Sequence, residues 1–170
     1  HTDPQRIQQA ILNLLVNAGQ GSERRDAQRA LLAALRESKK PRGAELMSAC
    51  RSAADSEVKA ALMEVMAQSG SDDALPLFRE TLAKGDEDLR RAAINALSQW
   101  TSAGPAPELL AAARGASSPA HRILALRGYI RLVALPTGRA PAETAKMLAV
   151  ALELAAQPAE KRAVLAALQR

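Results

Sequence analysis

The chain is poor in the residues from which most active sites are built. Its 170 residues include one cysteine, two histidines and three aromatic residues, Phe78, Trp100 and Tyr129. A single cysteine excludes an internal disulfide and a cysteine-based zinc site. No apolar run approaches the ~18 residues that a membrane-spanning helix needs. We therefore expect no disulfide scaffold, no membrane span and no cofactor, and few catalytic arrangements can be assembled.

Residues that favour β-strands are also scarce, with five isoleucines and six valines. Strands favour β-branched and aromatic side chains, because these fit a pleated, half-buried surface. Against this stand 38 alanines and 24 leucines, and both are strong helix formers. The composition therefore predicts an all-α protein.

Four segments with the same apolar pattern begin 31, 31 and 32 residues apart, at Ala27, Val58, Leu89 and His121. A poorer fifth copy begins at Lys161, after 40 residues. Each copy follows another amphipathic segment whose apolar residues are three and four positions apart, which is typical of a helix. A helix pair of this kind buries its apolar faces by stacking on the next pair. We predict one domain over residues 1–170, a short α-solenoid of about five antiparallel helix pairs, at about 3–38, 41–69, 71–100, 105–135 and 141–170.

The third copy carries the clearest family motif. It reads Asp-Glu-Asp-Leu-Arg-Arg-Ala-Ala-Ile-Asn-Ala-Leu from Asp86 to Leu97, and it follows Ala-Leu-Pro-Leu-Phe at Ala74 to Phe78. These segments resemble the HEAT-repeat family, including the short bacterial HEAT-like repeats of the phycobilisome-lyase type found in large multidomain bacterial proteins. The resemblance implies an armadillo-like solenoid that is no enzyme and acts as a scaffold for protein-protein interaction.

The net charge of +5 is not gathered into one basic stripe. Residues 1–42 and 105–142 are basic, whereas residues 43–104 are acidic. Nucleic acid is bound by a continuous basic surface and, when single-stranded, by stacking aromatic residues. We therefore expect a protein or peptide partner, with nucleic-acid binding as the alternative. A role in bilin attachment, suggested only by the name of the lyase-type repeats, is a third hypothesis.

The second helices of such a solenoid line its concave surface, so the binding positions are expected there. We select solvent-facing positions that lie three or four residues apart and outside the apolar columns. These are Arg29, Arg36, Glu64, Gln68, Arg91, Asn95, Gln99, Arg127 and Arg131.

One column of the repeat holds mostly basic residues, namely Gln28, Lys59, Arg90, Arg122 and, in the fifth copy, Arg162. Such residues could form a basic ladder. Alternatively, each stem packs between repeats while its head bonds a neighbouring carboxylate or helix end, and we favour this structural interpretation.

Other chemically suggestive residues have structural explanations. Cys50 and His121 are the only plausible nucleophile and base, but they belong to non-adjacent repeats. We interpret them as a small core residue and a half-buried residue at a helix start. The acidic clusters Asp72-Asp73 and Asp86 to Asp88 are typical of helix N-termini, where they cap free amides. Trp100 is either an exposed interaction anchor or a core residue between two repeats.

The chain begins with His1 and shows no signal peptide at its start. We expect a monomeric piece of a longer protein, whose compartment, exported or cytoplasmic, is set outside these residues.

Overall fold

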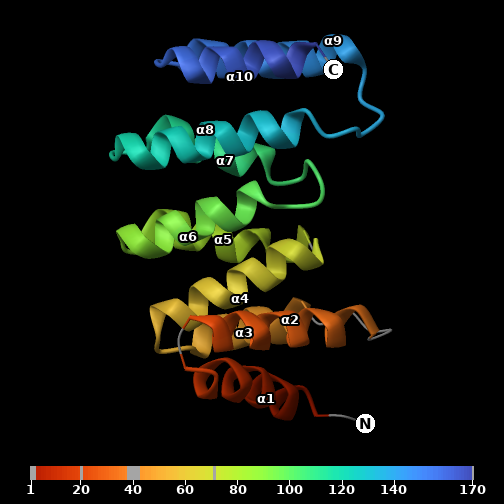
Figure 1. Ribbon diagram of the computed structural model, residues 1–170, viewed down its shortest axis with the longest axis vertical. Coiled ribbons are helices and arrows are strands. Elements are labelled where there is room, and N and C mark those ends of the chain that lie inside the picture. The colour runs from red at the N-terminus through yellow and green to blue at the C-terminus, as the bar shows by residue number, and fades with distance from the viewer. Residues whose placement is uncertain (1–2, 20, 38–42, 71, 170) are drawn as a thin grey trace. The chain divides into compact units, whose positions relative to one another are not determined.

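A computed structural model describes residues 3–19, 21–37, 43–70 and 72–169. Within these residues every regular element is a helix, and successive helices pair across short connections (Figure 1). This confirms the predicted all-α class and the series of about five helix pairs. The elements are α1 (Pro4–Asn17), α2 (Ser22–Glu37), α3 (Gly43–Ser52), α4 (Ser56–Ser69), the 3-10 helix η1 (Asp72–Ala74), α5 (Leu75–Lys84), α6 (Glu87–Ser98), α7 (Ala106–Gly115), α8 (Pro119–Val133), α9 (Pro141–Leu154) and α10 (Pro158–Leu168).

Residues up to Ala93 form one compact unit. Here α1 packs on α2 and α3, α2 packs on α4, and α3 packs on α4. First helices thus stack on first helices and second helices on second helices, as expected for a repeat protein. The core between them is apolar, with Leu15, Leu46, Leu62 and Phe78 fully buried.

Residues from Ile94 onward form the other compact unit. Its central element is α8, which packs on α7, α9 and α10. The core contains Trp100, Leu109, Leu126 and Tyr129. The Tyr129 hydroxyl donates to the Met147 carbonyl oxygen at 3.1 Å, and burial raises the pKa of this phenol above its ordinary value, against the opposing charges of Arg114 and Arg139.

The boundaries of α4 and the start of α6 follow the capping chemistry in the sequence, whereas α5, which follows Asp72 and Asp73, begins without a side-chain cap. The Asp55 carboxylate accepts from the Glu57 amide at 2.7 Å, and the Asp86 carboxylate accepts from the Leu89 amide at 2.8 Å. Both oxygens therefore satisfy an amide that has no partner within the helix. Gly70 ends α4 in the left-handed conformation (φ 69°), which costs glycine little.

Candidate functional site

In the first unit, four of the predicted surface positions are exposed and lie on second helices. Arg29 belongs to α2, Glu64 and Gln68 belong to α4, and Arg91 belongs to α6. Arg29 forms an ion pair with Asp26, and Arg91 forms one with Asp88 at 2.8 Å. Exposed pairs of this kind hold a side chain only weakly, so both guanidinium groups remain accessible. The side chain of Arg36 lies outside the described residues.

In the second unit, the remaining positions are Asn95 in α6, Gln99 directly after it, and Arg127 and Arg131 in α8. All four are exposed. Arg131 differs from the others because its guanidinium donates to the carbonyl oxygens of Ser98 at 2.8 Å and Trp100 at 3.2 Å. It therefore binds carbonyls at the C-terminal end of α6, a structural role that its spacing in the sequence does not reveal.

Two residues of the mostly basic column, Gln28 and Arg122, connect successive pairs. The Gln28 amide donates to the Ala61 carbonyl at 3.3 Å and to Glu64 at 3.0 Å. The Arg122 guanidinium donates to the Leu154 carbonyl at 3.0 Å and to Glu160 at 3.2 Å. For these two positions the structural interpretation is confirmed, because each head group bonds the helix pair that follows.

The register predicted for the fifth copy is wrong by one residue. The helix α10 begins at Pro158, so Glu160 is its third residue, the position that Val58 and His121 occupy in α4 and α8. Glu160 is buried as those two residues are. Arg162 consequently falls outside the column and donates within its own helix, to the Pro158 carbonyl at 3.4 Å. An alanine-rich segment repeats its small side chains in either register, which is why the pattern alone misplaced it.

Arg24 makes a further link between pairs that the sequence analysis missed. From α2, with a side chain only 12% exposed, its guanidinium forms ion pairs with Asp55, at 3.9 Å, and with Glu57. Both carboxylates lie at the start of α4. Two guanidinium groups, Arg24 in the first unit and Arg122 in the second, thus join a second helix to the acidic start of the next second helix.

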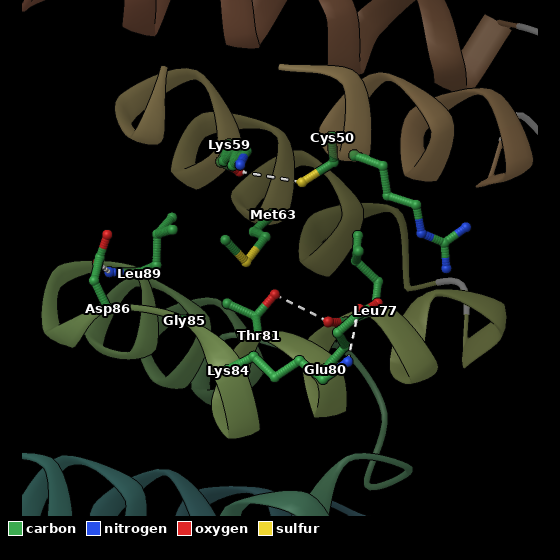
Figure 2. Close-up of a pocket in the computed structure, with 11 residues that line it drawn as sticks. Cys50, Lys59, Met63, Leu77, Glu80, Thr81, Lys84, Gly85, Asp86 and Leu89 are labelled. Carbon is green, nitrogen blue, oxygen red and sulfur yellow. Dashed lines mark hydrogen bonds and ion pairs between the residues drawn. The ribbon is translucent and has the colours of Figure 1, made fainter. Parts of the chain in front are cut away.

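A cleft of about 460 Å³ lies between the second and third pairs, within the first unit (Figure 2). Residues of α3 and α4 line one side, and residues of α5 and α6 line the other. Figure 2 shows Met63 pointing from α4 toward Thr81. The charged lining residues are Arg51, Lys59, Glu80, Lys84 and Asp86.

Three of these five charges already have partners. The Lys84 ammonium lies 3.6 Å from a carboxylate oxygen of Glu80, and Asp86 caps α6. In the part of the chain that the structure describes, neither Lys59 nor Arg51 has a side-chain hydrogen bond or ion pair. The cleft therefore contains two cations without a direct partner among the described residues, and its three positive and two negative side chains give it a net charge of +1.

Cys50 lies at this cleft but is suited to packing rather than to chemistry. It is 3% exposed, and its thiol donates to the Lys59 carbonyl over 3.8 Å. Burial raises the pKa of the Cys50 thiol to about 11, although Lys59 and Arg51 act in the opposite direction. Since the thiolate is the nucleophile, Cys50 is protonated and unreactive at neutral pH, as expected for a small core residue.

We expect native Cys50 to react with a disulfide reagent such as DTNB at least about 100-fold more slowly than in the unfolded chain, from the rise in its pKa alone. The absorbance of released thionitrobenzoate measures both rates, with the chain in guanidinium chloride as the fully reactive control. Equal rates in the two states would contradict the buried, protonated thiol.

His121 and Trp100 are buried as well. His121 is 8% exposed and Trp100 is 0% exposed. His121 lies at the start of α8, as predicted, and is more deeply buried than expected. Trp100 is a core residue, so the interpretation as an exposed anchor is wrong. Within the described residues no group of His, Cys, Asp and Glu could hold a metal ion, and no helix there is long and apolar enough to cross a membrane.

Paired helices that stack first on first and second on second define an α-helical repeat protein of the solenoid class. The family model of HEAT repeats matches residues 43–130, which is more than half of the chain. The chain therefore belongs to the HEAT-repeat family, whose repeats typically mediate protein interaction. Searches of curated proteins and of solved structures found no match. The phycobilisome-lyase type and the bacterial origin stay predictions.

Proposed function

We propose that the chain is a non-catalytic HEAT-repeat scaffold that binds a protein or peptide partner through exposed positions of its second helices. The observation that carries the proposal is the exposure of Arg29, Glu64, Gln68 and Arg91 in the first unit and of Asn95, Gln99 and Arg127 in the second. Side chains that recur on successive second helices present an extended binding surface.

The chemistry of these positions favours a protein over a nucleic acid. They combine arginines with a glutamate and with neutral amides, whereas a phosphate backbone is bound by a continuous basic stripe. All three aromatic side chains are buried, so none is available for stacking on a base. Nucleic-acid binding remains the alternative, and DNA binding that weakens steeply with added salt would favour it over the proposal.

Reversing charge at Arg91 and Arg127 tests this surface. We expect Arg91→Glu with Arg127→Glu to weaken capture of a partner about tenfold or more, because like charges across an interface repel and the arginine hydrogen bonds are lost. Partners are captured on the immobilised chain, identified by mass spectrometry, and their affinities are then measured with each variant.

Arg6→Glu with Arg114→Glu is the matched control, since it makes the same charge change at exposed positions on the first helices α1 and α7. Capture that falls equally in both double variants reports net charge alone. If the Arg91 and Arg127 variant binds as well as the unmodified chain, the assigned surface is wrong. Arg131→Glu is kept separate, because Arg131 also binds the end of α6.

A further inference from the structure

The cleft between the second and third helix pairs lacks a carboxylate that the last two pairs possess. In those pairs, Arg122 is the fourth residue of α8 and donates to Glu160, the third residue of α10. Lys59 is likewise the fourth residue of α4, and Leu89 is the third residue of α6. Lys59 therefore places a cation where the last pairs have Arg122, whereas the apolar Leu89 stands at the position of its acidic partner Glu160.

The volume and the charge of the cleft suit a carboxylate from another molecule. Its volume of about 460 Å³ lies within the range of binding pockets. Lys59 is partly buried there and has no ion-pair partner among the described residues, and Arg51 also lines the cleft without one. Glu80 pairs with Lys84, and Asp86 accepts from the Leu89 amide, so within the described residues neither carboxylate forms an ion pair with Lys59 or Arg51.

We propose that this cleft binds a glutamate or aspartate side chain from an acidic segment of a partner protein, which serves Lys59 as an acceptor in the way that Glu160 serves Arg122. The carboxylate accepts hydrogen bonds from the Lys59 ammonium. Partly exposed Leu89 contacts the apolar neighbour of the acidic residue. The inference rests on the proposed function only in that the partner is a protein segment, since no residue of the cleft belongs to the surface proposed above.

The test is a titration of the full chain, labelled with ¹⁵N, with the acetylated peptide Glu-Leu-Glu-Leu. We expect saturable shifts of the amide signals of Lys59, Gly85 and Leu89, and no saturable shifts with the matched peptide Gln-Leu-Gln-Leu. Lys59→Gln is expected to weaken binding about tenfold, as for the loss of one charge-assisted hydrogen bond. Lys146→Gln, an exposed lysine in α9 that does not line the cleft, is the control for net charge and leaves binding unchanged.

Leu89→Glu supplies the missing carboxylate from within the chain. We expect this variant to keep its helical circular dichroism and to lose peptide binding, because its own side chain then occupies Lys59. If Leu89→Glu does not fold, peptide binding by the folded Lys59→Gln variant decides the test. The proposal is overturned if the glutamate peptide causes no saturable shifts, if Lys59→Gln binds it as tightly as the unmodified chain, or if inorganic phosphate binds the cleft more tightly than the peptide.

These outcomes are independent of the proposed function. The Arg91→Glu and Arg127→Glu variant is expected to bind the glutamate peptide normally, since neither residue lines the cleft. Loss of partner capture with intact peptide binding would contradict the cleft as the main site of that partner. The opposite result is that the Arg91 and Arg127 variant still captures the partner and Lys59→Gln does not. It would place recognition in the cleft and refute the second-helix surface.

Discussion

Replacing Glu160 with alanine is expected to lower the free energy of unfolding of residues 94–170 by about 3 kcal/mol. Its side chain is fully buried and accepts from the amides of Ala156 and Gln157, both at 2.8 Å. It also accepts from Arg122 at 3.2 Å, and the Arg122 side chain is only 23% exposed. The substitution therefore removes the acceptor of two helix-start amides, and it leaves the partly buried Arg122 guanidinium with only the Leu154 carbonyl.

Urea unfolding followed by tryptophan fluorescence measures this loss, because Trp100 is the only tryptophan and belongs to the same unit. Glu153→Ala is the matched control. Glu153 is exposed on α9, so we expect a change within about 0.5 kcal/mol. A double-mutant cycle with Arg122→Met isolates the ion pair, with an expected coupling of about 1–2 kcal/mol. A loss below about 1 kcal/mol for Glu160→Ala would contradict the proposed role of this carboxylate.

The same carboxylate makes stability depend on pH. Burial raises the pKa of Glu160, but the amides of Gln157 and Ala156 and the Arg122 charge together hold it below the usual value of 4.5. A carboxyl whose pKa is lowered by folding stabilises the native state above its unfolded pKa, and this contribution disappears as the pH falls through the folded pKa. The unmodified chain is therefore expected to exceed Glu160→Gln in free energy of unfolding by the largest amount near about pH 7. This difference is expected to shrink below about pH 4.

The fold could be predicted from the sequence because it depends on periodic features. Apolar residues three and four positions apart fix which face of each helix is buried, and the 31-residue recurrence places equivalent helices in equivalent environments. Aspartates such as Asp55 and Asp86 mark helix starts through local hydrogen bonds. These signals require no knowledge of distant contacts, so the all-α class and the helix pairs follow from them.

Only part of the links between pairs could be predicted: the repeat column indicated those of Gln28 and Arg122, whereas the others depend on how far a side chain reaches across two helices. Arg24 and Glu160 carry no periodic signal, yet each contacts the neighbouring pair. Arg131 has the spacing of a surface residue, while its guanidinium binds the end of α6. The missing partner of Lys59 is found only by comparing equivalent positions in the structure, since a sequence does not distinguish a lysine that has an ion-pair partner from one that has none.

Replacing Gly128 with valine is expected to lower the free energy of unfolding of the same unit by about 3 kcal/mol, the upper end of overpacking effects. A Cβ atom at this buried position would lie 2.0 Å from the Ser98 hydroxyl oxygen, 2.8 Å from the Ser98 Cβ and 3.0 Å from a methyl group of Leu109. The hydroxyl can rotate away, but the Ser98 Cβ is fixed to the backbone, so α8 must shift.

Gly115 provides the matched control, because it is also a helical glycine and a Cβ there would meet nothing within 4 Å. Gly115→Val should cost at most about 0.5 kcal/mol, since valine has the higher helix propensity of the two. Urea unfolding monitored at Trp100 again gives both values. Ser98→Gly in the Gly128→Val background should restore part of the lost stability by removing the nearest carbon atom. If the two valine variants are equally stable, the close approach at Gly128 does not limit packing, and the small residues of this repeat are not required as spacers between its helices.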